Sequence, residues 1–133
     1  MAFQDTWDTA VEDLEALQES WEARVHAYAE DGEGLDPGAV ADHLCKDSWR
    51  AVRKDLERVE FLGPQSVDVC MRELRETFRA MVDVIGGQSQ AGASCPHWDE
   101  WHPVLARAQV ARFEFQVAAM DALRRPPSPE GVG

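Results

Sequence analysis

The sequence predicts an all-α protein, an up-down-up-down four-helix bundle. Apolar residues recur at spacings of three and four in four successive segments, and glycine and proline are concentrated between these segments. No segment alternates apolar and polar residues with the period of two that a half-buried strand shows. A chain of 133 residues is also long enough to bury the core of one domain without disulfides or a metal.

The first segment, residues 3–30, is predicted to form a long amphipathic helix. Its apolar stripe consists of Phe3, Trp7, Val11, Leu14, Leu17, Trp21, Val25 and Tyr28. Four glutamates fall away from this stripe and form an acidic face toward solvent, made of Glu12, Glu15, Glu19 and Glu22. Residues 1–36 hold eleven acids and one cation, Arg24, and therefore carry ten of the twelve excess negative charges.

This charge distribution narrows the range of partners. It repels nucleic acid and anionic membranes, so we expect neither as a direct partner, whereas a basic protein would be attracted. The N-terminal residues are acidic and no apolar run approaches the ~20 residues of a membrane span, which predicts a cytoplasmic protein. Three cysteines fit no disulfide framework and suit a reducing compartment.

Capping residues, helix-breaking residues and apolar periodicity predict the second and third helices. The second should begin at Pro37 with Asp36 as its N-cap and end at FLGP, residues 61–64. Its stripe is Cys45, Trp49, Val52, Leu56 and Val59. The third is expected over residues 65–85, before a long Gly/Ser-rich loop that follows Ile85. Its stripe is Val67, Met71, Leu74, Phe78, Met81 and Ile85.

The middle of the chain, WRAVRKDLERVEFLGPQSV, resembles a stretch of small uncharacterised helical proteins of actinobacteria, some of which carry a membrane anchor. The resemblance covers roughly the middle third and rests on the VEFLGP ending of the second helix. It implies an α-helical protein without an assigned function, and it transfers no site residues.

The fourth helix, which should run to Arg125, is apolar on two sides. One side suits the bundle core and consists of Ala106, Val110, Phe113, Val117 and Met120. The other is predicted to be a partner surface, most simply the interface of a two-fold homodimer, made of Val104, Ala108, Ala111, Phe115, Ala118 and Ala122. The simpler alternative is that alanines occupy exposed helix positions through their high propensity. Residues 1–125 are expected to form a single domain, and residues 126–133 a disordered tail.

The stretch SCPHWDEWHP, residues 94–103, precedes or begins this helix. Pro103 predicts that the helix kinks there, or that it is split, with a short turn over residues 96–101 before a main helix. With alternating helices, all four histidines, at positions 26, 43, 97 and 102, fall toward one end of the bundle. His26 and His43 should face solvent by their helical phase, and His102 should face the core.

The residues at this end are of the types found in two kinds of site. Candidate metal ligands are Cys45, Cys95, His97 and His102, but their spacing matches no zinc signature, so no metal or other cofactor is predicted. Candidate ligand-binding residues are Cys45, Trp98, Trp101 and His102, as an aromatic-lined pocket or as a thiol–imidazole dyad. No third orienting group or oxyanion hole is visible, so no catalytic residue is predicted.

The favoured function is a non-enzymatic bundle that acts through protein–protein contacts, as a homodimer with the fourth helix at its centre. The alternative is a small-molecule or metal-binding bundle, with or without enzymatic activity, that uses the His/Cys/Trp-rich end. A third is an acidic inhibitor of a nucleic-acid-binding protein, in which the acidic face stands in for phosphates.

Overall fold

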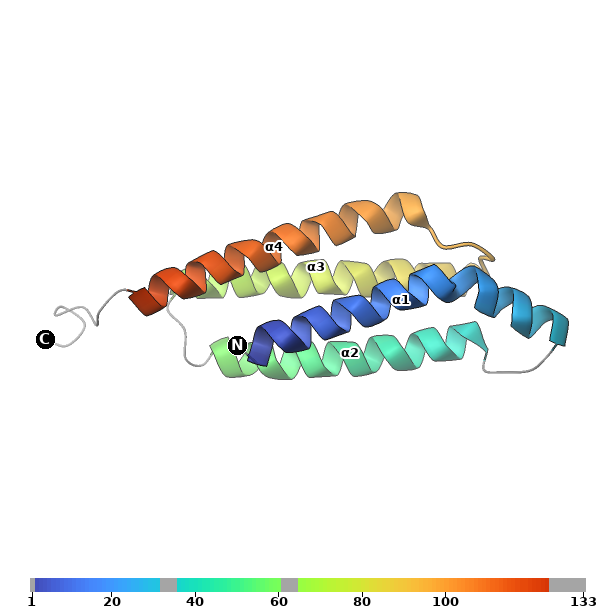
Figure 1. Ribbon diagram of the computed structural model, residues 1–133, viewed down its shortest axis with the longest axis horizontal. Helices are drawn as coiled ribbons and strands as arrows, with labels where there is room; N and C mark the ends of the chain where they lie inside the picture. Colours follow the sequence, from blue (N-terminus) through green and yellow to red (C-terminus); the bar gives the residue numbers. More distant parts are fainter. Residues whose placement is uncertain (1, 32–35, 61–64, 125–133) are drawn as a thin grey trace, which may run out of the picture.

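A computed structural model describes the backbone of residues 2–31, 36–60 and 65–124, and the side chains of residues 5–30, 36–57 and 69–121. These residues form four helices without a strand among them: α1 (Ala2–Asp31), α2 (Pro37–Glu60), α3 (Gln65–Gln90) and α4 (Trp98–Arg124). Successive helices run in opposite directions and pack against their neighbours (Figure 1). The predicted all-α four-helix arrangement is confirmed. The predicted cap at residues 61–64 and the tail at residues 126–133 lie outside the described residues.

Aromatic side chains from three helices meet in the core. The Phe78 ring of α3 lies 5.4 Å from the Trp7 ring of α1 and 5.9 Å from the Trp49 ring of α2, measured between ring centroids. Members of the predicted stripes of all three helices are buried, such as Leu14 of α1, Leu56 of α2 and Leu74 of α3. Burial of large apolar side chains along the whole bundle is the main stabilising contribution.

The last turns of α1 depart from the predicted stripe. Between residues 22 and 30 only Val25 is half-buried, and Tyr28 is 42% exposed. Figure 1 shows why: the C-terminal end of α1 extends beyond the start of α2, where no neighbouring helix covers it.

Helix α2 begins as predicted. Pro37 is its first residue, and Asp36 accepts a hydrogen bond from the backbone N–H of Gly38 on its side-chain Oδ1 at 3.1 Å. The Asp36 carbonyl accepts from Val40 N–H at 3.0 Å. The side chain therefore satisfies a donor that the first turn leaves unpaired.

Helix α3 is longer than predicted. It continues through Gly86 and Gly87 to Gln90, because Gln88 is fully buried and hydrogen-bonded there. Its end is a Schellman motif: Ala93 N–H donates to the Gln88 carbonyl, and Gly92 N–H donates to the Ser89 carbonyl. Gly92 has φ of +63°, a left-handed conformation that glycine adopts without strain. The loop to α4 is consequently short.

Helix α4 is continuous through Pro103, so the predicted split does not occur. It begins at Trp98, and the His97 carbonyl accepts from the N–H groups of Glu100 and Trp101. Asp99 and Glu100 occupy the first turn, where acids interact favourably with the helix dipole. Because α4 is continuous from Trp98, the position of Trp98 determines which side of the helix each later residue faces.

The predicted assignment of the two sides of α4 is wrong. Ala108, Ala111 and Phe115, expected at a partner surface, are at most 2% exposed and belong to the core. Val110 and Phe113, expected in the core, are 56% and 64% exposed. Val104 and Ala118 of the predicted interface are half-buried against the core, and Ala122 lies outside the described side chains.

Trp101 explains the reversal. It is 2% exposed and lies seven and fourteen residues before Ala108 and Phe115, and therefore on the same side of the helix. Burying its large ring favours this side over the one with Phe113. The small side chains of Ala108 and Ala111 are compatible with the close approach of α4 to α3.

Candidate functional site

The outward side of α4 carries an exposed apolar stripe. This outer stripe consists of Ala106, Val110, Phe113, Val117 and Met120, all exposed. Its members are spaced four, three, four and three residues apart. That alternation is the seven-residue repeat of a coiled-coil seam, in which two apolar positions per two turns face another helix. Surface helices of a monomer normally show polar residues in this position.

Ion pairs on both flanks hold α4 in this orientation. On the α1 side, Arg112 donates two hydrogen bonds to the Asp8 carboxylate, at 2.6 and 2.9 Å. On the α3 side, Arg107 donates to Glu73 Oε1 at 2.9 Å. The hydrogen bonds to Asp8 raise the pKa of Arg112, which favours the charged guanidinium. A rotation of α4 that buried the outer stripe would break both pairs.

The apolar surface continues from α4 onto α3. Val69 of α3 is 66% exposed and shares a shallow hollow of about 310 Å³ with Val110. The thiol of Cys70 lies against the backbone carbonyl of Glu114 at the base of this region, at 3.8 Å. The exposed patch is therefore broader than one helix ridge on its α3 side.

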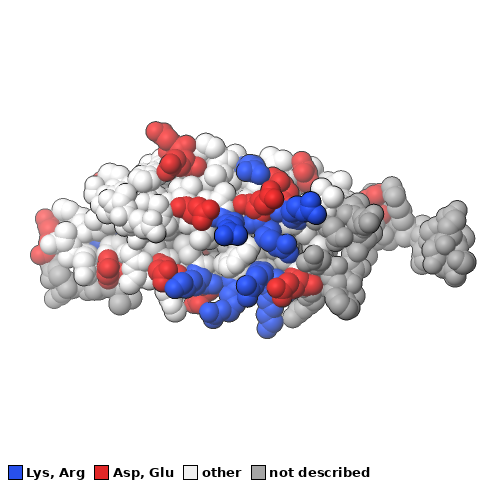
Figure 2. Space-filling view, turned by 180° about the vertical axis from the view of Figure 1, so that it is seen from behind, with Lys and Arg blue, Asp and Glu red and all other residues white. Residues whose placement is uncertain are grey.

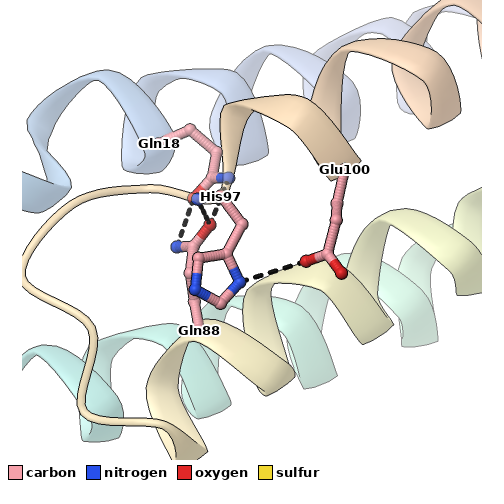
Figure 3. A network of polar contacts seen from close by, with 4 residues as sticks. All are labelled: Gln18, Gln88, His97 and Glu100. Carbon is pink, nitrogen blue, oxygen red and sulfur yellow. Dashed lines mark hydrogen bonds and ion pairs between the residues drawn. The ribbon is translucent and has the colours of Figure 1, made fainter.

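A buried polar network fixes where α4 begins (Figure 3). The side-chain amides of Gln18 and Gln88 each donate to the other's oxygen at 2.7 Å, and both residues are fully buried. The same Gln88 oxygen accepts the backbone N–H of His97 at 2.9 Å. One residue pair thus joins α1, α3 and the residue before α4. Unpaired, these groups would each cost about 1–3 kcal/mol of stability.

A second hydrogen bond supports the same end of the bundle. The Trp21 indole N–H of α1 donates to the Ala93 carbonyl in the loop between α3 and α4, at 2.9 Å. The loop is therefore fixed to α1 at two points, and the direction in which α4 leaves it is determined.

The structure does not assemble the predicted ligand-binding residues into one pocket. Trp101 is in the core, whereas Trp98 and His102 are exposed and pack edge to face on α4 with centroids 5.3 Å apart. The prediction that His102 faces the core is wrong, because the phase set from Trp98 turns it outward. Cys45 is buried on α2 beside a hollow whose other lining residues belong to α2 and α3.

The thiol of Cys45 lacks the character of a nucleophile. Burial, and secondarily the nearby Asp42 carboxylate, raise its pKa to about 11. It is therefore protonated at neutral pH, which is the opposite of the thiolate that a thiol–imidazole dyad would need.

Three of the histidines near this end lie beside an acid three or four residues further along the chain. His26 lies 3.3 Å from Glu30, and His43 lies 3.2 Å from Asp47, both on exposed surface as their phase predicts. His97 Nδ1 lies 3.1 Å from Glu100 (Figure 3). Among the described residues, no group of three or more His, Cys, Asp or Glu side chains could hold a metal ion. The four candidate metal ligands Cys45, Cys95, His97 and His102 are not brought together.

The acidic face of α1 is on the surface as predicted. Glu12, Glu19 and Glu22 are exposed and Glu15 is half-buried. Partial burial, and then the charges of Glu19 and Glu12, raise the pKa of Glu15. The face is therefore a stripe of mutually repelling carboxylates.

Cations gather on a different part of the molecule. Figure 2 shows Lys and Arg crossing the face seen from behind, mixed with Asp and Glu. Pairs within α2 neutralise part of this charge, such as Lys46 with Asp42 at 2.9 Å. The exposed cations of α2 and α3 include Lys46, Arg50, Arg53, Lys54, Arg72 and Arg79.

An open hollow of about 600 Å³ between α1 and α2 is absent from the predicted sites. The signal that could have revealed it is a pair of small residues on facing helices, Ala16 and Ala39. Its lining also includes Leu17, Val40, Leu44, Asp13, Arg24 and His43. Five of its eight lining residues are apolar, and the polar ones are Asp13, Arg24 and His43.

Comparisons with known proteins give no independent guide. No protein-family model matches the chain, and neither a curated protein nor a solved structure is similar to it. No described helix is both long and apolar enough to cross a membrane. Function has to be inferred from the surfaces themselves, of which the outer stripe departs most from an ordinary helix.

Replacing Gln88 by Leu should lower the free energy of unfolding by about 2–4 kcal/mol, because the Gln18 amide and the His97 N–H both lose a buried partner. Adding Gln18→Leu to the Gln88→Leu variant should lower the free energy of unfolding by less than Gln18→Leu does in the wild-type protein. The reason is that an apolar pair then replaces the amide pair. Urea unfolding of the two single variants and the double variant measures this. Strict additivity would contradict the role of the amide pair.

Cys45 should resist iodoacetamide at pH 8 while the exposed Cys95 is labelled. Because the raised pKa favours the protonated thiol in the folded state, Cys45 should cost stability as the pH rises from 9 toward 11. Mass spectrometry of labelled peptides over a pH series measures the reactivity, and Asp42→Asn should shift its onset to lower pH. Equal labelling of both thiols at pH 8 would overturn this picture.

Proposed function

We propose that the protein is a non-enzymatic helical interaction module whose outer stripe on α4 binds a helix of another polypeptide chain. The observation that carries the proposal is the exposure of Val110, Phe113 and Val117 on the side of α4 that points away from the core. Exposed apolar patches rimmed by polar residues are characteristic of protein–protein contact sites.

The spacing of the outer stripe supports a helix as the occupant. Apolar residues spaced alternately three and four apart line one side of a helix, and a second helix packed along that side can bury all of them. The neighbours of the seam are polar, with Gln109 and Gln116 on one side and Arg107 and Glu114 on the other. A polar rim around an apolar centre is the usual composition of such an interface.

The rigidity of α4 supports the proposal as well. Arg112 with Asp8, and Arg107 with Glu73, fix both flanks of the helix, and the buried amides fix its start. A surface that is ordered before binding loses little conformational entropy when it is bound. At the His/Cys/Trp-rich end, by contrast, Cys45, Trp101 and His102 do not line one pocket. We therefore prefer an interaction function to a ligand-binding one.

A photo-crosslinking residue tests this proposal without assuming the identity of the partner. Phe113→p-benzoylphenylalanine, expressed in the native host and irradiated, should form covalent adducts with a polypeptide, either a second copy or another protein. The matched control is the same residue at Glu19 on the acidic face, which is equally on the surface. Adducts at neither position, or equal yields at both, would contradict the outer stripe as a binding surface.

A further inference from the structure

We infer that the helix bound by the outer stripe is α4 of a second copy of this chain, running antiparallel to the first. This inference rests on the proposed function, since it names the partner of that same surface. It is argued from how well the outer stripes of two copies fit each other, first in side-chain size and then in charge.

A two-fold axis between positions 113 and 117 brings the stripe into register with itself. Phe113 of one copy then faces Val117 of the other, and Val110 faces Met120. Each layer pairs a longer side chain with a shorter one, and the axis repeats each layer in reverse. Such a surface is self-complementary, as a two-fold interface requires.

The same register places opposite charges together at the edges. In an antiparallel pair of helices, one set of flanking residues faces the same set of the other helix across the seam. In α4 this set is Arg107, Glu114 and Asp121, which directly follow Ala106, Phe113 and Met120. Arg107 of each copy therefore lies opposite Asp121 of the other, and the contact occurs twice. Within its own copy, Arg107 donates to Glu73 Oε1 at 2.9 Å.

A parallel arrangement lacks this match. It would set Gln109 beside Glu114 and Gln116 beside Asp121, and would gain no pair of opposite charges. The antiparallel register has one unfavourable contact, between the Glu114 side chains of the two copies near the axis. Two attractive contacts against one repulsive contact favour the antiparallel direction.

The size of the contact sets its strength. One helix from each copy supplies most of the surface, with Val69 of α3 at its margin, so the buried area falls below the ~1,200 Å² of standard stable interfaces. The acidic face of α1 adds long-range repulsion between copies. We therefore expect a reversible dimer with a dissociation constant in the micromolar range.

Disulfide trapping tests the pairing and its direction. In a Cys70→Ser, Cys95→Ser background, Val110→Cys and Met120→Cys are made as separate proteins of different tag length, mixed, and oxidised with glutathione disulfide. Val110→Cys should cross-link to Met120→Cys, while each alone gives little dimer. The reason is that like positions lie about 15 Å apart along an antiparallel pair, at ~1.5 Å per residue. The background protein without new cysteines is the control for Cys45.

The outcomes separate the possibilities. Efficient cross-linking of Val110→Cys to itself would overturn the antiparallel direction. In sedimentation equilibrium, Phe113→Glu should weaken the wild-type dimer at least about tenfold and Glu114→Gln should strengthen it, with unchanged circular dichroism. A monomer at hundreds of micromolar would overturn the second copy as partner. The proposed function would survive that result if the photo-crosslinker at Phe113 captured a different chain, and would fail with it if nothing were captured.

Discussion

Gln18 and Gln88 exchange hydrogen bonds inside the bundle, and Gln88 also accepts the backbone N–H of His97 at the start of α4. Buried amides lose their hydrogen bonds if any of the three segments slips along another, so α1, α3 and the loop into α4 share one register. Trp101 enters the core one turn after His97, and Ala108 and Phe115 follow at intervals of seven. The outward direction of Val110, Phe113 and Val117 is a consequence of this polar contact near the other end of the helix.

Local sequence signals predicted most of the fold because the physics behind them is local. The N-cap at Asp36 and the stripes of the first three helices depend on neighbouring residues and on one clearly apolar side per helix. Helix α3 extends beyond the end that its local signals predict, because Gly86 and Gly87 disfavour a helix locally while the buried contacts of Gln88 sustain it.

The orientation of α4 was not predictable in the same way. Both of its sides have helical periodicity and similar apolar content, so periodicity alone does not distinguish them. The choice is made by contacts between residues far apart in sequence: Gln88 with His97, Trp101 with the core, and Arg112 with Asp8. The sequence did predict that one apolar side of α4 would lie outside the core. The histidine-rich end resembled a binding site only through its composition.

The outward orientation of Phe113 is the central claim, and a matched pair of substitutions tests it most directly. Phe113→Ala and Phe115→Ala remove the same ring from opposite sides of one helix. Urea unfolding at a protein concentration low enough to keep the chain monomeric should show a loss of about 3–5 kcal/mol for Phe115→Ala and of less than about 1 kcal/mol for Phe113→Ala. A large loss at Phe113 with a small one at Phe115 would contradict the account.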